Sequence, residues 1–317
     1  MFKGILKGQS FWVKIIALIG MAIFSMSMFT AISALLVKPL FGINIVTDAG
    51  SLMDFNNPAT VAAYKFLQIV QAIALFIIPA LIFPYLCGEN TVTYLKMRKQ
   101  PVALLFLLVL LLSYFSSPLF ELTNQLNQKM ALPQFLKGLE DWMKAKEDQL
   151  NDLTKVFLKM DNLNQLWLNL FMMAILPAIG EEFLFRGVAQ RLFIEGFKNA
   201  HLGIWVAAIV FSTLHFQFYG FLPRMLLGVL FGYLFYWSGN IWLAIFAHFV
   251  NNATVVVFSY MFQHKIINFN IDDSNSLSVA AYLVCFLVST SLLLAFYRFA
   301  TKKTSLENYG SSLDQNL

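Results

Sequence analysis

Charged residues are scarce in this chain of 317 residues, at 12% of the sequence against about 25% in a typical soluble domain. Hydrophobic residues make up 59%, and the mean hydropathy is +0.68. A soluble globular domain is excluded by this balance. The net charge of +5 is not gathered into a basic patch interleaved with aromatic residues, so the sequence gives no support to a nucleic-acid partner.

Cysteine is almost absent as well. Cys87 and Cys285 both lie in apolar segments and far apart in the chain, which fits neither a disulfide framework nor a cysteine metal motif. We interpret both as buried thiols. The sequence also contains no His-Glu-x-x-His motif of a zinc protease and no internal repeat.

Long apolar runs are what the chain has in abundance. Runs of 18 or more such residues indicate helices that cross a bilayer, and the sequence therefore predicts an all-α polytopic membrane bundle of about eight transmembrane helices. The expected spans are 13–37, 62–88, 101–120, 165–186, 203–220, 222–238, 240–262 and 278–299. Gly220 and Pro223 are expected to form a tight turn between the fifth and sixth. The first run is too long for the apolar part of a signal peptide, so an uncleaved span is favoured.

These runs divide the chain into four regions. Residues 1–120 carry the first three spans, 165–262 carry spans four to seven as a core, and 263–317 hold the last span and a polar tail. Between them, 121–164 is the only sizeable hydrophilic region, with apolar residues at near-helical spacing. We expect it to form one or two amphipathic helices on the extracytoplasmic membrane surface.

Basic residues orient the spans. If the N-terminus is cytoplasmic, that side receives the Lys and Arg clusters near residues 3–14, 96–99, 186–198 and 298–303. The opposite flanks carry fewer, and the basic charge of 121–164 is offset by acidic residues. The asymmetry predicts that both termini are cytoplasmic. The chain shows no organelle-targeting segment, and a bacterial inner membrane with its lipid as a partner is the expected location.

Two adjacent carboxylates and a guanidinium stand at the end of one apolar run, LNLFMMAILPAIGEEFLFRG. Each charge placed at bilayer depth costs roughly 3 kcal/mol or more. Glu182 and Arg186 are four residues apart and can pair on one helix face, whereas Glu181 lies about 100° around the helix. The spacing predicts that Arg186 holds one carboxylate and leaves the other free to act on a ligand. A purely structural ion-pair network is the alternative.

Two later apolar runs carry further polar groups: His215 in FSTLHF, and His248 with Asn252 in AIFAHFVNNA. A carboxylate and a histidine together can activate water and relay its proton. A histidine and an asparagine can stabilise an oxyanion. Glu181, His215 and His248 are also a plausible Zn²⁺ ligand set, so zinc or no cofactor both remain open. Hydrogen bonding between helices is the structural alternative for these side chains.

The three motifs resemble those of the CPBP family, the CAAX-protease and bacteriocin-processing intramembrane proteases. EEFLFR is similar to its E-E-x-x-x-R signature, Phe211 to His215 to its F-x-x-x-H motif, and His248 to Asn252 to its H-x-x-x-N motif. The resemblance covers about 165–255. We assign Phe211 and Asn251 to packing and leave both out of the catalytic set.

This resemblance implies an intramembrane endopeptidase acting on a peptide or protein substrate near the cytoplasmic membrane face. Glu181 would activate water with help from His215, Glu182 and Arg186 would orient the site, and His248 with Asn252 would stabilise the oxyanion. The family is described both as metalloproteases and as metal-independent glutamate proteases. The Ras-converting enzyme, its eukaryotic member, removes the last three residues of prenylated CAAX proteins at a site open to the cytosol.

Two other functions are compatible with the same residues. A non-catalytic immunity or scaffold protein of this family would keep its function when Glu181 is replaced by Gln. A proton-coupled transporter also uses Glu, His and Arg within the membrane. The inverted repeats of hydropathy that are typical of many transporters are not visible in the sequence.

Overall fold

A computed structural model of the chain describes residues 2–45, 50, 54–98, 101–269 and 277–314, with side chains as far as Lys302. These residues form helices, turns and connecting segments, and no strand is found in the described part. The helical elements are α1 Phe11–Phe41, α2 Pro58–Ala72, η2 Ile73–Ile77, α3 Ile78–Leu86, α4 Thr91–Tyr94, α5 Ala103–Gln128, η3 Gln134–Leu136, α6 Lys137–Leu158, α7 Leu163–Asn169, η4 Leu170–Ile175, α8 Leu176–Glu182, η5 Phe183–Ala189, α9 Gln190–Phe197, α10 Ala200–Thr213, η6 Phe218–Gly220, α11 Phe221–Ser238, α12 Ile241–Gln263 and α13 Val279–Asp314. The predicted all-α polytopic membrane bundle is confirmed.

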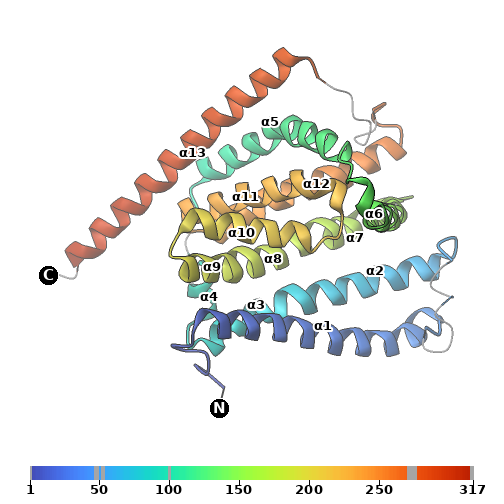
Figure 1. Ribbon diagram of the computed structural model, residues 1–317, viewed down its shortest axis with the longest axis horizontal. Helices are drawn as coiled ribbons and strands as arrows, with labels where there is room; N and C mark the ends of the chain where they lie inside the picture. Colours follow the sequence, from blue (N-terminus) through green and yellow to red (C-terminus); the bar gives the residue numbers. More distant parts are fainter. Residues whose placement is uncertain (1, 46–49, 51–53, 99–100, 270–276, 315–317) are drawn as a thin grey trace.

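Within the described residues, seven helical runs are long and apolar enough to cross a membrane, and α10 is a shorter apolar helix. The run from α7 through α9, Leu163–Phe197, is the most enclosed, with 61% of its apolar window buried against 11% for the first and last runs. It lies between α2–α3 on one side and α12 on the other (Figure 1). The carboxylates that the sequence singled out are therefore carried by the central helix of the bundle.

The fifth run ends earlier than the sequence predicted. Helix α10 stops at Thr213, and the chain turns through 214–220 with Phe216 in the left-handed region at φ 54°. Gly220 precedes α11 at φ −110°, and Pro223 lies inside the first turn of α11, where a missing N–H breaks no helical hydrogen bond. The predicted tight turn at Gly220 and Pro223 is therefore wrong. The 14 residues of α10 span about 21 Å, less than the roughly 30 Å of a hydrocarbon core.

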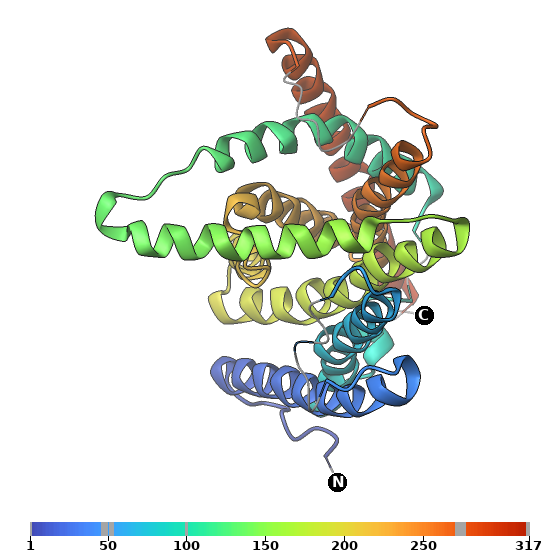
Figure 2. The ribbon, with the colours of Figure 1, turned by 90° about the vertical axis from the view of Figure 1, so that its right-hand side faces the viewer.

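The hydrophilic region 121–164 contains one long helix, α6, which lies across one end of the bundle (Figure 2). Its Glu147 accepts a hydrogen bond from the Tyr219 amide at 2.8 Å, and its Asn151 accepts one from Gln217 at 3.2 Å. At its start, the Lys144 ammonium and the Leu132 amide donate to Glu140 and lower the pKa of that carboxyl. Glu140 is therefore ionised at neutral pH.

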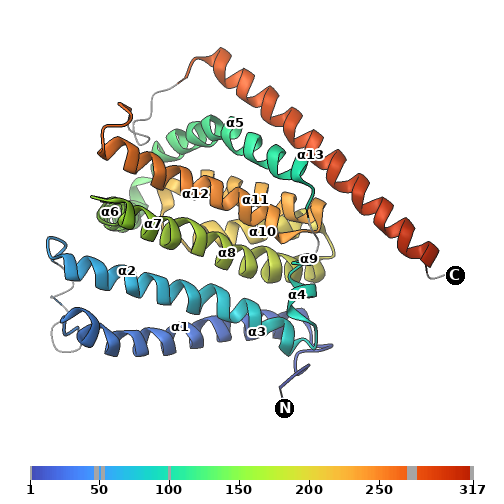
Figure 3. The ribbon, with the colours of Figure 1, turned by 180° about the vertical axis from the view of Figure 1, so that it is seen from behind.

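Both chain ends lie away from α6, at the other end of the spans (Figures 1 and 3). The even number of helical passes, counting α10, produces this arrangement. The predicted placement of both termini on one side of the membrane agrees with this arrangement.

Gly203 is where α10 approaches α9 most closely. A Cβ at this position would lie 2.7 Å from the Ile194 backbone nitrogen and 2.9 Å from its Cα. We expect Gly203→Ala to destabilise the bundle by about 1–3 kcal/mol, because the backbone of α9 must move. The measurement is the thermal unfolding temperature of the purified protein in detergent.

Gly20→Ala is the matched control, because no atom lies within 4 Å of a Cβ built at Gly20 in α1. This variant should unfold at the wild-type temperature or slightly above it, since Ala is the better helix former. Equal unfolding temperatures for the two variants would contradict the close approach of α9 and α10.

Candidate active site

Glu181 and Glu182 lie on a helix that contains two π-helical segments. The π-helical turns η4 and η5 flank α8, which ends on Glu181 and Glu182. Pro177 is the second residue of α8 and has no N–H to donate to the Met173 carbonyl four residues earlier. The Asn252 side chain of α12 donates to that carbonyl at 3.1 Å. Single π-helical turns inside α-helices frequently occur at functional sites.

Glu182 and Arg186 form an ion pair in the interior, with 3.0 Å between Glu182 Oε1 and Arg186 Nη1. Their side chains are 0% and 2% exposed. Arg186 also donates to the Gly228 carbonyl at 3.0 Å, and its guanidinium lies 4.8 Å from the centre of the Phe211 ring. The pairing predicted from the four-residue spacing is confirmed, with Glu182 as the carboxylate that Arg186 holds.

Each of the two histidines has its Nδ1 atom engaged. His248 Nδ1 lies 2.9 Å from Glu182 Oε1, and His215 Nδ1 lies 2.8 Å from the Phe211 carbonyl oxygen. A carbonyl or an ionised carboxylate can only accept, so the proton of each neutral ring is on Nδ1. The Nε2 atom of each neutral ring is therefore an acceptor, fixed in direction by the hydrogen bond on the other side.

Glu181 is the point on which the two rings converge. Its Oε2 atom lies 4.0 Å from His215 Nε2 and 3.9 Å from His248 Nε2. This oxygen is buried and has no hydrogen-bond partner among the described residues. Three acceptor atoms that face one another need a donor between them, because buried polar atoms are almost always satisfied.

The spacing of these atoms suits a water molecule better than a metal ion. Two atoms that each form a hydrogen bond of about 2.8 Å to the same water lie roughly 4–4.6 Å apart. The distances from Glu181 Oε2 to the two Nε2 atoms match this spacing. Two ligands of one tetrahedral Zn²⁺ are only about 3.3 Å apart. In the described part of the chain, no group of three or more His, Cys, Asp and Glu side chains is placed to hold a metal. Glu181, His215 and His248 thus do not fit the zinc set in this conformation.

The Glu181 side chain lines a cavity of about 680 Å³. His215, His248, Asn251 and Asn252 line the same space, and it extends to the side chains of α6. Helix α10 ends at Thr213, and the 214–220 turn that follows closes one side of this space by hydrogen bonds from Gln217 and Tyr219 to α6. The cavity therefore extends to α6, the helix at the end of the bundle opposite to the termini (Figure 1). Cytoplasmic termini would place the α6 end of this cavity on the opposite side of the membrane.

Four of the six candidate residues, Glu181, His215, His248 and Asn252, line one cavity. Glu182 contacts His248 from behind and pairs with Arg186. Asn252 also makes hydrogen bonds within the protein. One N–H of Asn252 is used on the Met173 carbonyl, and its Oδ1 accepts from Asn251 at 3.0 Å. The remaining N–H of the amide is available to a ligand. Asn251, which we had assigned to packing, lines the cavity beside it.

Arg224 and Phe231 are cavity residues that the sequence analysis missed. Arg224 lines the cavity and donates to the Gln217 side chain at 2.6 Å. A single arginine in the apolar run FLPRMLL was a visible signal for it, since such charges mark functional sites. Phe231 stacks on the His248 ring with centroids 5.4 Å apart, and nothing distinguished it from the other 32 of the 33 phenylalanines.

Two comparisons with known proteins found a match. Residues 163–254 match the family described as type II CAAX prenyl endopeptidase Rce1-like, which confirms the resemblance inferred from the motifs. Over 100 residues, or 30% of this chain, the sequence is 31% identical to the uncharacterized protein YpbD of Bacillus subtilis (strain 168). The match covers 48% of that protein, so the chain spans about half the length of this relative. No solved structure matches the chain.

Proposed function

We propose that this protein is an intramembrane endopeptidase that hydrolyses a peptide bond in the cavity beside Glu181. The observation that carries the proposal is the convergence of Glu181 Oε2 with the Nε2 atoms of His215 and His248, at 4.0 and 3.9 Å. The match of residues 163–254 to an endopeptidase family supports the same reaction.

In the proposed reaction, a water donates one hydrogen to Glu181 and the other to His215. Its oxygen attacks the carbonyl carbon of the peptide bond while Glu181 takes the proton, as a general base. Glu181 then returns the proton to the leaving nitrogen, and the C–N bond breaks. One water is consumed, and the products are a carboxylic acid and an amine, which leave the cavity as a carboxylate and an ammonium after the acid has given its proton to the amine.

His248 and Asn252 are proposed to stabilise the oxyanion of the intermediate. His248 Nδ1 lies 2.9 Å from Glu182 Oε1, and the Nε2 atom becomes a donor to the oxyanion when the ring takes up a second proton during the reaction. The free N–H of Asn252 is the second donor, and preorganised donors of this kind are usually the largest contribution to such catalysis.

The proposed substrate is a peptide or a protein segment that reaches the membrane, and the lipid bilayer is the protein's environment. No step requires zinc. We define the site of cleavage by the cavity, which extends to α6, and not by the cytoplasmic face that the family resemblance implied. An immunity or scaffold role is the alternative that the following experiment separates from catalysis.

The test is cleavage of a peptide library by the purified protein in detergent, with and without a chelator. We expect cleavage, and we expect it to be unchanged by the chelator, because the three side chains are spaced for water. Activity that disappears with the chelator and returns with zinc would contradict the metal-free mechanism. The absence of cleavage in the library, in micelles and in lipid vesicles alike would favour the scaffold role.

A further inference from the structure

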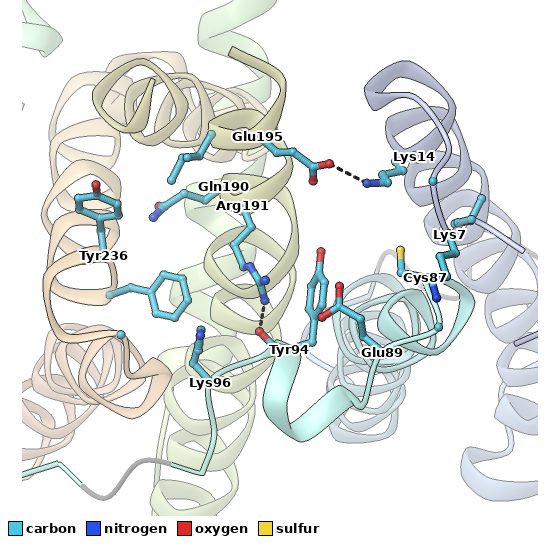
Figure 4. Close-up of a pocket in the computed structure, with 16 residues that line it drawn as sticks. Lys7, Lys14, Cys87, Glu89, Tyr94, Lys96, Gln190, Arg191, Glu195 and Tyr236 are labelled. Carbon is cyan, nitrogen blue, oxygen red and sulfur yellow. Dashed lines mark hydrogen bonds and ion pairs between the residues drawn. The ribbon is translucent and has the colours of Figure 1, made fainter. Parts of the chain in front are cut away.

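A second cavity, of about 580 Å³, lies at the end of the bundle that carries the N-terminus. Its walls are formed by the N-terminal segment, the start of α1, the connection from α3 to α4, helix α9 and the end of α11 (Figure 4). It shares no lining residue with the cavity beside Glu181. The proposed peptidase activity leaves this cavity without a role.

The N-terminal wall of this second cavity is fixed to the bundle. The Gly4 amide donates to the Tyr85 carbonyl at 3.2 Å, and the Leu6 amide donates to the Leu86 carbonyl at 2.8 Å. Gly4 and Gly88 approach so closely that a Cβ at Gly88 would lie 3.4 Å from the Gly4 Cα. The segment before α1 thus forms a defined side of the cavity.

Cations outnumber carboxylates in the lining. Lys7, Lys14, Lys96 and Arg191 face two carboxylates, Glu89 and Glu195. Lys14 pairs with Glu195 at 2.8 Å, which neutralises one of each sign. No carboxylate of the described residues lies within 4.0 Å of the other three cations. The cavity therefore has an excess of two positive charges.

Arg191 is the cation whose position is fixed. Its guanidinium lies over the Tyr94 ring, 3.9 Å from the ring centre, and donates from Nη1 to the Tyr94 carbonyl oxygen. Stacking holds the plane of the guanidinium and leaves its other N–H groups for a ligand. A planar, oriented guanidinium suits the oxygen atoms of a phosphate.

The cavity lies where the membrane surface is expected. Helix α1 begins at Phe11 and α3 ends at Leu86, so its walls are built where spans end. The aromatic side chains of Trp12, Tyr85 and Tyr236 are exposed nearby, and Trp and Tyr are enriched at the level of lipid headgroups. Leu6, Ile194 and Phe235 give the cavity an apolar part beside its cations.

From this combination we propose that the second cavity binds the phosphate of an anionic phospholipid, with Arg191 as its principal contact and Lys7 and Lys96 beside it. The excess positive charge selects an anionic headgroup over a zwitterionic one. The apolar part of the lining selects a lipid over a free phosphate ion.

The experiment is a lipid titration of the full chain, purified in an uncharged detergent and observed by native mass spectrometry. Phosphatidylglycerol and phosphatidylcholine with identical acyl chains are compared as ligands, and inorganic phosphate is added as a competitor. We expect phosphatidylglycerol to bind preferentially. Arg191→Gln should weaken it by about tenfold or more, because a charge-assisted hydrogen bond is lost.

A double variant, Lys7→Gln with Lys96→Gln, leaves the Arg191–Tyr94 contact intact and should also weaken binding of phosphatidylglycerol. Lys129→Gln is the matched control, because it removes one exposed positive charge at the α6 end and should leave binding unchanged. Equal binding of the two lipids, or equal effects of Lys129→Gln and Arg191→Gln, would overturn the proposal. Full displacement of the lipid by millimolar inorganic phosphate would identify a site for the free ion instead.

Discussion

Replacing Glu181 by glutamine is expected to lower the rate of peptide hydrolysis by about 10²–10⁴-fold, the usual contribution of a general base. Glutamine keeps the shape of the side chain but cannot take a proton from water. The fold should be preserved, because Glu181 makes no ion pair with Arg186 and its distances to the two histidines are 4.0 and 3.9 Å. The measurement is single-turnover cleavage beside the unfolding temperature of the same preparation.

Two variants sharpen this result. Glu195→Gln changes an exposed glutamate that pairs with Lys14, on the far side of the bundle, and should keep the wild-type rate. Glu181→Asp keeps the base but withdraws it by about 1.5 Å, and should retain part of the activity. A Glu181→Gln protein that cleaves as fast as wild type would refute the proposed role of this carboxylate.

Replacing Arg186 by methionine is expected to destabilise the protein by about 3–5 kcal/mol, because a buried carboxylate then loses its partner. The change also removes the hydrogen bond to the Gly228 carbonyl. A loss of this size should lower the unfolding temperature by roughly 10 °C or more. The measurement is thermal unfolding in detergent, with the wild type scanned at the same rate.

A double-mutant cycle tests whether the ion pair is the cause. Glu182→Gln combined with Arg186→Met leaves neither an unpaired carboxylate nor an unpaired guanidinium in the interior. The double variant should therefore be less destabilised than the sum of the two single variants. Strict additivity would mean that Arg186 stabilises the bundle through its packing against Phe211 and Phe231, and not through Glu182.

Hydropathy was sufficient for the architecture because spans are defined by length and polarity alone. It failed at the end of the fifth span. The apolar run continues past Thr213, but Phe216 takes a left-handed backbone conformation and ends the helical region. No local signal marks this turn, since phenylalanine is not a residue that favours it. The turn makes tertiary hydrogen bonds to α6 through Gln217 and Tyr219, which a local pattern cannot show.

The polar residues of the candidate site were visible in the sequence because charges within apolar runs are costly. The i,i+4 spacing identified the partner of Arg186 correctly. The spacing could not show which atoms of the histidines face Glu181, because that depends on the Phe211 carbonyl and on Glu182. It also could not show that the Asn252 side chain donates to the Met173 carbonyl.

The chain ends and α6 lie at opposite ends of the bundle. The side of the membrane from which substrates reach the Glu181 cavity can therefore be tested by labelling the termini. A reporter fused to either terminus marks the compartment opposite to α6 (Figure 3), the helix that lines one end of the cavity. A reporter that is active in the cytoplasm would mean that peptides arrive from outside the cell and that fragments leave in the same direction. A reporter exposed outside the cell would mean that substrates reach the cavity from the cytoplasm. The assay can be done before any substrate is known.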